Sequence, residues 1–234
     1  MACAGKSAAV CFFNMRKITA IAVQKKNPNR VSISLDDEFA FGLSRLVAAW
    51  LKVGQELSDE KIAELQTADA REMAFQKAMR FLGYRARSVQ EVRDNLEKHE
   101  IPEAVIEEVL KRLQETGLLN DQQFAQTWVE NRNTFRPRSR RALSLELRRK
   151  GLDDEVVQDV LNENVDENAL ALEAARKYTR KVHGLEWLEF RQKLGGFLGR
   201  RGFSYPVIAP VLRQIWDETH PDGDPTFDDD EEIT

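Results

Sequence analysis

The most chemically distinctive residues of this chain are basic side chains that crowd into one short segment. Residues 132–150 hold eight basic side chains and a single acid, Glu146. The basic residues are Arg132, Arg136, Arg138, Arg140, Arg141, Arg148, Arg149 and Lys150. The planar guanidinium fork of arginine fits both phosphate and carboxylate groups. The segment therefore predicts a surface that binds an anionic partner, although a run of charge is also typical of a solvated helix face.

Further arginines extend this candidate surface on both sides of the segment. Arg200 and Arg201 end a second basic stretch, residues 176–201, in which eight bases accompany two acids. Arg85 and Arg87 precede the first stretch. We include these four arginines among the candidate contact residues, because a stripe of positive charge attracts a phosphate backbone or an acidic protein surface.

Signals of catalysis or of metal binding are weak. The three histidines, His99, His183 and His220, are far apart and lack the close spacing of metal ligands. The glycines of residues 195–199 are not followed by the Lys and Ser or Thr of a phosphate-binding loop. No nucleophile is spaced with a general base. We therefore predict a binding protein with no catalytic residues, no cofactor and no metal.

The apolar residues indicate what positions these charges, because they recur twice at a constant offset of 51 residues. The recurring sets are Val92, Leu143 and Leu194; Leu96, Leu147 and Leu198; Ile101, Leu152 and Phe203; Val105, Val156 and Val207; Val109, Val160 and Val211; and Leu110, Leu161 and Leu212. Their spacing within each copy is helical. The same offset aligns Lys98 with Arg149 and Arg200. Repeated helical units pack on their neighbours, so we predict an array that presents its surfaces to other macromolecules.

Capping residues and helix breakers divide this array into three repeats of three helices. The first repeat covers residues 68–119, where Ser88 and Glu91 form a capping box for its second helix. The second repeat covers residues 120–168, and the third covers residues 169–216. The predicted fold class is mainly α, with three tandem three-helix repeats in an elongated array that follows a small N-terminal module of a β-hairpin and helices.

Residues 17–67 carry the signals of that N-terminal module. The segment 17–35 alternates in polarity on both sides of a turn at Lys25–Asn29, which is typical of a β-hairpin. A lone hairpin is marginal in water, so it must pack on another element. The apolar residues of segment 37–50 have the spacing of a helix that could cover it, and Ser58 is placed to cap the next helix.

The two ends of the chain and its composition bound the cellular setting. Residues 1–16 are interpreted as a disordered leader and hold both cysteines, so disulfides are not expected and the cytoplasm is indicated. No apolar run reaches the roughly 20 residues that span a bilayer. Residues 217–234 contain nine acids and no Lys or Arg, and removing these nine charges from the net charge of −4 leaves +5. We predict that this segment is a disordered tail, which either aids solubility or competes for the basic surface.

Several motifs, in their order and spacing, resemble the RecX family of regulatory proteins. They are Tyr84-Arg85-Ala86-Arg87-Ser88, Gly117-Leu118-Leu119-Asn120-Asp121 with Phe124-Ala125, and Glu146-Leu147-Arg148-Arg149-Lys150-Gly151-Leu152. The resemblance extends from Lys17 to Trp216. One departure is Ser139, which follows Arg136-Pro137-Arg138 where the family commonly has glycine.

The resemblance implies a protein that binds the RecA nucleoprotein filament and modulates, by inhibition, its recombinase and coprotease activities. That function belongs to homologous recombination, DNA repair and the SOS response. Single- or double-stranded DNA is a further candidate partner, no membrane partner is expected, and we expect a monomer. The alternative is a helix-turn-helix protein that acts on duplex DNA directly, but groove-reading helices need base-contacting side chains at their N-terminal end, and Glu91 places an acid there.

Overall fold

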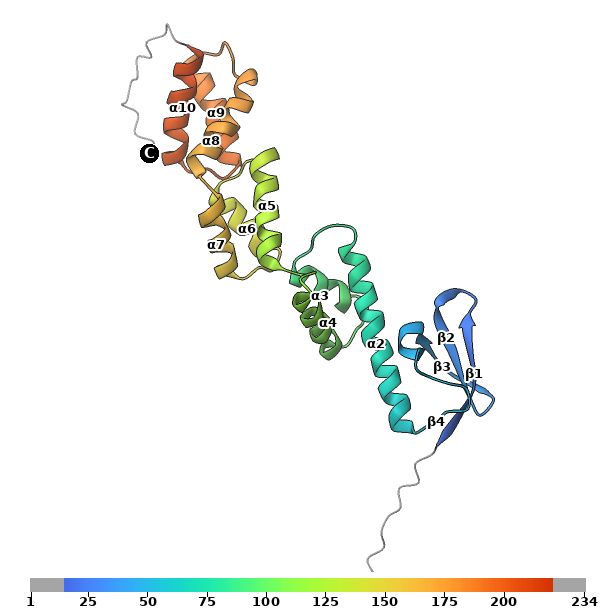
Figure 1. Cartoon of the computed structure of the whole chain (residues 1–234). Coiled ribbons are helices and arrows are strands. Elements are labelled where there is room, and N and C mark those ends of the chain that lie inside the picture. Colours follow the sequence, from blue (N-terminus) through green and yellow to red (C-terminus); the bar gives the residue numbers. More distant parts are fainter. Residues whose placement is uncertain (1–14, 221–234) are drawn as a thin grey trace, which may run out of the picture. The chain divides into compact units, whose positions relative to one another are not determined.

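The computed structural model describes residues 15–220 (Figure 1). Most of the predicted leader, and the predicted tail beyond His220, lie outside the described residues. The chain divides into two compact units. The first unit consists of the residues up to Arg85 together with Val92–Glu115, and the second consists of Ala86–Glu91 together with the residues from Thr116 onward.

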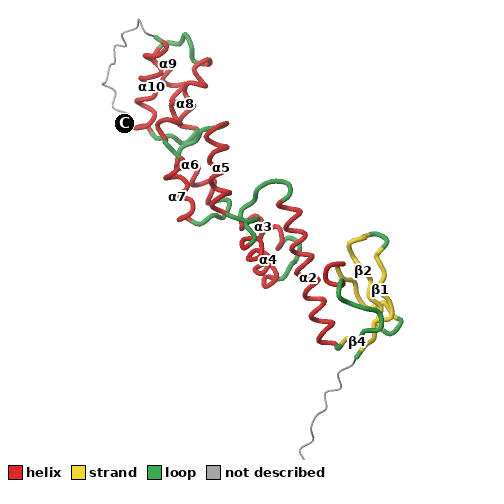
Figure 2. The backbone as a smooth tube through the Cα atoms, in the orientation of Figure 1, coloured by secondary structure: helices red, strands yellow, loops and turns green. Residues whose placement is uncertain are grey.

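The first unit contains a four-stranded antiparallel sheet with the strand order β3-β2-β1-β4. Its strands are drawn in yellow in Figure 2. Its elements are β1 (Arg16–Gln24), β2 (Asn27–Leu35), β3 (Glu38–Ser44), the short helix α1 (Arg45–Ala48) and β4 (Glu56–Leu57). β1 and β2 form the predicted hairpin, in which Ile21 pairs with Ile33. Ile18, Ile33, Leu35 and Leu43 are fully buried in the core of this module.

The helix predicted over residues 37–50 is wrong for most of its length, because β3 occupies its first half. Asp36 and Asp37 have φ angles of 51° and 69°, which turn the chain sharply back after β2. Phe41 and Leu43 are then buried at alternate positions while β3 pairs with β2. The apolar residues fit a strand period as well as a helical one, and pairing with a neighbouring strand decided between them.

A long helix, α2 (Asp59–Leu82), connects the sheet to the first repeat. The side-chain oxygen of Ser58 caps it as predicted, by accepting the N–H group three residues further on at 3.2 Å. The boundary predicted between residues 67 and 68 falls inside this continuous helix. The buried carboxylate of Asp69 anchors it to the sheet, because one oxygen accepts from Arg30 at 2.9 Å and the other from the backbone N–H of Ser44 at 2.6 Å.

The remaining helices complete the three predicted repeats. They are α3 (Val89–Glu97), α4 (Glu103–Glu115), α5 (Asp121–Phe135), α6 (Arg140–Arg148), α7 (Asp154–Asn164), α8 (Glu167–Tyr178), the 3-10 turn η1 (Thr179–Lys181), α9 (Trp187–Arg200) and α10 (Tyr205–Thr219). The first repeat uses the C-terminal part of α2 with α3 and α4. The helix α10 extends to Thr219, so Asp217 and Glu218, predicted as the start of the tail, are helical. Glu218 forms an ion pair with Arg176 of α8 at 2.6 Å.

The burial pattern confirms the 51-residue repeat. Leu96, Leu147 and Leu198 are all fully buried, and so are Val92, Leu143 and Leu194. The set formed by Val105, Val156 and Val207 is partly buried in all three copies. In the second unit, one apolar cluster runs from Phe124 to Trp216, so the second and third repeats share a continuous core.

Candidate partner-binding surface

Several of the predicted contact arginines are neutralised within the second unit. Glu146 accepts from Arg132 Nε at 2.8 Å and from Arg138 Nη1 at 2.9 Å. The indole Nε1 of Trp128 donates to the same carboxylate at 2.9 Å, and the guanidinium of Arg132 lies over the Trp128 ring. The only acid of the basic segment is thus the centre of a structural network, and Arg132 stabilises the fold.

Two more members of the predicted set are also held by internal contacts. Arg140, at the start of α6, donates to the backbone oxygen of Leu161 in α7 at 2.9 Å. Arg148 pairs with Asp154 at 2.6 Å. Asp154 begins α7, the helix that follows the basic segment, so the partner of Arg148 lies outside that segment.

Four of the predicted contact arginines are exposed in the second unit and have no internal partner among the described residues. They are Arg136, Arg141, Arg149 and Arg200. Within residues 15–220 their guanidinium groups have no ion pair or hydrogen bond. Of the two earlier candidates, Arg85 is exposed and Arg87 is half-buried, and both interact with other residues of the chain.

We use the word joint for a contact between the start of the second helix of one repeat and the following repeat. The first joint is the contact of residues 88–91 with Lys150 and Gly151. Ser88 Oγ caps α3 by accepting from the N–H of Glu91 at 3.2 Å, and it donates to the backbone oxygen of Lys150 at 2.6 Å. The side chain of Lys150 pairs with Glu91 at 2.7 Å. Gly151 has φ 78°, and a Cβ there would lie 2.3 Å from Cβ of Gln90. The Glu91 carboxylate, expected only to complete a capping box, therefore also binds the second repeat.

The second joint repeats this arrangement 51 residues later, between residues 137–142 and the pair Arg201 and Gly202. Ser139 caps α6 and its N–H donates to the backbone oxygen of Arg201 at 3.1 Å. Arg201 Nη1 donates to the backbone oxygen of Pro137 at 2.9 Å. Gly202 has φ 92°, and a Cβ there would lie 2.6 Å from Ser139 Oγ. Ser139, the residue that departs from the resembled family, is fully buried in this joint.

The two joints differ in their electrostatics. Burial lowers the pKa of the Arg201 guanidinium, and the positive charges of Arg138 and Arg136 lower it further. Lys150, at the equivalent position of the first joint, has a carboxylate partner in Glu91. The residue equivalent to Glu91 in the second joint is Ala142. The second joint therefore gathers like charges that the first joint neutralises.

The joints also bear on the alternative of groove reading. A helix-turn-helix protein inserts the N-terminal residues of its second helix into the major groove. In the first repeat the start of α3 is packed against Lys150 and Gly151. In the second repeat the start of α6 is packed against Arg201 and Gly202. These two helix ends are therefore occupied by the following repeat.

The third repeat is built differently at this position. Phe190 stands 51 residues after Ser139 and is buried, in contact with Trp187 and Trp216. The helix α9 begins at Trp187 and thus has an extra turn before this position. In the third repeat this aromatic cluster therefore takes the place of a joint.

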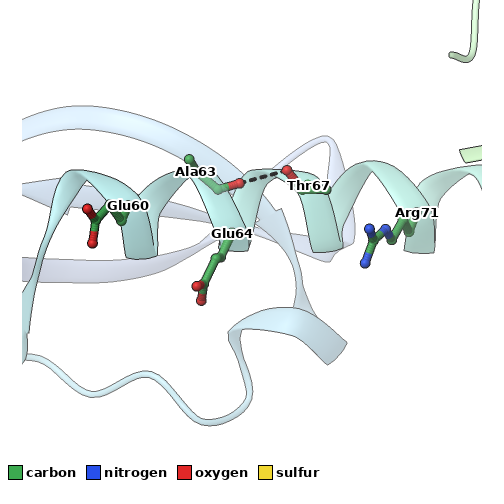
Figure 3. Close-up of a pocket in the computed structure, with 5 residues that line it drawn as sticks. All are labelled: Glu60, Ala63, Glu64, Thr67 and Arg71. Carbon is green, nitrogen blue, oxygen red and sulfur yellow. Dashed lines mark hydrogen bonds between the residues drawn. The ribbon is translucent and has the colours of Figure 1, made fainter. Parts of the chain in front are cut away.

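Elsewhere in residues 15–220 the structure offers little chemistry. A shallow depression on one face of α2 is lined by Glu60, Ala63, Glu64, Thr67 and Arg71 (Figure 3). Thr67 donates to the backbone oxygen of Ala63 at 2.8 Å, a contact internal to the helix. No group of side chains in the described part of the chain could hold a metal ion, and no helix there is long and apolar enough to cross a membrane.

Comparison with known families matches the whole repeat architecture. Residues 16–58 match the regulatory protein RecX N-terminal domain. Residues 74–113, 120–161 and 166–212 match the first, second and third three-helix domains of RecX. These matches follow the sheet module and the three repeats in order.

Relatives and solved structures agree with these matches. The chain is 39% identical over 202 residues to the regulatory protein RecX of Bacillus subtilis (strain 168), covering 85% of this chain and 76% of that protein. It is 36% identical over 207 residues to the regulatory protein RecX of Bacillus pumilus, covering 87% of this chain and 79% of that protein.

A crystal structure of regulatory protein RecX superposes with a TM-score of 0.67 at 27% identity, over 85% of this chain and 99% of that one. A crystal structure of RecX from Lactobacillus salivarius gives a TM-score of 0.57 at 25% identity, over 63% of this chain and 97% of that one. With the ordered domain matches and the identity to its relatives, these structures show that the chain belongs to the RecX family of regulatory proteins.

Proposed function

We propose that this protein is a RecA regulator that binds the RecA nucleoprotein filament and inhibits its recombinase and coprotease activities. Membership of a family of regulatory proteins supports the proposal. It would act as a monomer in homologous recombination, DNA repair and the SOS response, and so in the cytoplasm.

The observation that carries the filament-binding part is the set of exposed arginines without internal partners. Arg136, Arg141, Arg149 and Arg200 all lie in the second unit. Structural arginines such as Arg132 and Arg148 already have carboxylate partners. An exposed guanidinium without a partner keeps all of its donors available for an anionic surface. A nucleoprotein filament presents both phosphates and protein carboxylates, so it suits this surface.

The occupied N-terminal ends of α3 and α6 argue against direct groove reading of duplex DNA. An inserted helix would have to separate Ser88 from Lys150, or Ser139 from Arg201. Each separation would expose the contacts of a joint and leave its buried polar groups without partners, which is costly. The filament proposal needs no such opening.

The proposal is tested by reversing two of the exposed charges. We expect Arg149→Glu combined with Arg200→Glu to abolish co-sedimentation with RecA filaments on single-stranded DNA and to restore strand exchange. The matched control is Arg180→Glu combined with Arg191→Glu, which makes the same change of net charge at exposed residues of the same unit. Inhibition that survives in the first variant, or that is lost equally in the control, would contradict the proposed surface.

A further inference from the structure

We propose that Arg136, Arg138 and Arg201 form a binding site for the phosphodiester backbone of a nucleic acid. The inference rests on the proposed function and deepens it, because it names the nucleic-acid strand of the filament as the group that the second joint contacts. The site lies where the loop after α5 meets the end of α9, two segments of the second unit.

The backbone contacts of the second joint hold Arg201 in place. Its carbonyl oxygen accepts from the N–H of Ser139, and its Nη1 donates to the carbonyl oxygen of Pro137. Its guanidinium also lies over the ring of Phe197, 4.5 Å from the ring centre. These contacts fix the side chain beside the loop that carries Arg136 and Arg138. A guanidinium held in this way loses little conformational entropy when it binds a ligand.

The charge in this site is only partly compensated. Arg138 pairs with Glu146, which is also bound to Arg132 and Trp128. Arg136 has no ion pair within residues 15–220, and Pro137 supplies Arg201 with a neutral carbonyl oxygen. The lowered pKa of Arg201 reflects its burial and the repulsion from the other two guanidiniums. A bound anion would remove that repulsion.

The pattern favours a phosphodiester over protein carboxylates. Within this chain single carboxylates already pair with one arginine, as Asp154 does with Arg148, or with two, as Glu146 does with Arg132 and Arg138. The second unit instead offers a local site of three arginines, with Arg141, Arg149 and Arg200 as further exposed positive charges. A nucleic-acid backbone carries a negative charge at every nucleotide and releases counterions when such a group of cations binds it.

The first joint provides the internal reference for this proposal. There Glu91 neutralises Lys150, and the equivalent position of the second joint is occupied by Ala142. The substitution Ala142→Glu should therefore transfer a carboxylate into the second joint, facing Arg201. We expect it to block the phosphate site without removing any arginine.

The experiment measures binding of the full chain to a bare fluorescent oligothymidylate and to a duplex of the same length, without RecA, over a series of salt concentrations. The slope of interest is that of the logarithm of the binding constant against the logarithm of the salt concentration, which is negative. We expect Arg136→Gln combined with Arg201→Gln to make this slope less steep by about 0.7 per lost contact on the single strand and by about 0.9 on the duplex. At about 0.1 M salt this corresponds to a loss of affinity of roughly 25-fold on the single strand. Ala142→Glu should produce a loss in the same direction.

The control is Arg191→Gln. Arg191 lies in α9, the helix that ends next to Arg201, and is ten residues away from Arg201 in the sequence. The substitution should leave both the affinity and the slope unchanged. Since Arg201 also supports the joint, Arg201→Lys serves as a second variant that keeps the positive charge. It should retain the salt slope of the wild type. Circular dichroism verifies that each variant is folded. A loss confined to the single strand, or common to both probes, identifies which nucleic acid the site accepts.

Unchanged oligonucleotide binding in folded variants of Arg136 and Arg201 would overturn the phosphate site. The same holds if those variants lose binding to RecA alone, without DNA, because the partner would then be an acidic protein surface. Failure of the regulator proposal has a different signature, since the wild-type chain would then bind oligonucleotides but leave RecA strand exchange unaffected.

Discussion

The two joints of the second unit have nearly the same backbone contacts and opposite electrostatic character. In both, a buried serine caps a helix and contacts the carbonyl oxygen of a basic residue 62 positions further on. Ser88 donates to it from its hydroxyl group, and Ser139 donates from its backbone N–H. In both, a glycine with positive φ follows that basic residue and packs closely against residues at the N-terminal end of the capped helix. The first joint then pairs Lys150 with Glu91, whereas the second leaves Arg201 beside Arg136 and Arg138.

This difference separates two tasks that the repeat performs. The serine, the glycine and the buried leucines are common to both joints because they hold adjacent repeats together. The charges differ between the joints although the serine and glycine contacts recur. Glu91 neutralises the first joint, whereas the second joint carries the positive charge on which the proposed partner binding would depend.

The largest effect is expected from cavities in the shared core positions. Leu147→Ala and Leu198→Ala each remove a fully buried side chain, so each should lower the free energy of unfolding by about 2 to 5 kcal/mol. Leu198→Ala should reduce hydrogen-exchange protection in α8 to α10 more than in α4, because coupling between repeats passes from neighbour to neighbour. A uniform loss of protection over all repeats would show a single cooperative globule instead.

The glycines of the joints come next. Gly151→Ala should cost about 2 to 4 kcal/mol, because it adds a steric overlap with Gln90 to the strain of a left-handed backbone. Gly202→Ala should behave alike. Gly117→Ala is the control, since Gly117 has φ 70° but no atom near its missing Cβ, and only about 1 kcal/mol of strain is expected. Equal costs in urea unfolding for all three would contradict the tight packing of the joints.

The ion pair of the first joint should contribute less. Glu91→Gln is expected to lower the free energy of unfolding by about 1 to 2 kcal/mol, because its partner Lys150 is only partly exposed and would lose its counter-charge. Glu97→Gln, at an exposed residue of the same helix, should have almost no effect. Thermal unfolding of the two variants measures the difference. Equal melting temperatures would show that the ion pair of Lys150 and Glu91 contributes no more to stability than an exposed surface pair.

The smallest effect concerns Asp121, whose carboxylate accepts the N–H of Val89, the first residue of α3, at 2.9 Å. Burial raises the pKa of its carboxyl group, and the charge of Asp153 raises it further. The folded state thus holds this proton more tightly than the unfolded state, so the cost of the charge is absent at low pH and appears as the pH rises through the raised pKa.

We expect Asp121→Asn to keep the hydrogen bond and to raise the free energy of unfolding at pH 7 by at most about 1 kcal/mol, since solvent screens the partly exposed carboxylate. The gain should vanish at an acidic pH below the raised pKa of Asp121, where the carboxyl group of the folded wild type holds its proton. Urea unfolding at the two pH values tests this. A variant that is less stable than the wild type at pH 7 would show that the N–H of Val89 needs a charged acceptor.

The repeats, their helices and their buried positions followed from the sequence alone. Helical periodicity is a local property of the chain, and the offset of 51 residues carried the same pattern through Leu96, Leu147 and Leu198. The strand β3 did not follow, because the residues around Phe41 and Leu43 fit either period and only pairing with β2 selects one of them.

The composition of the candidate surface was decided by the tertiary structure. The sequence shows that residues 132–150 are rich in arginine, but not that Arg148 is paired while Arg149 is exposed without a partner. The partner of Lys150 lies 59 residues earlier, and the contact of Arg201 with Pro137 spans 64 residues. Periodicity is set by neighbours along the chain, whereas the pairing of charges depends on which distant segments folding brings together.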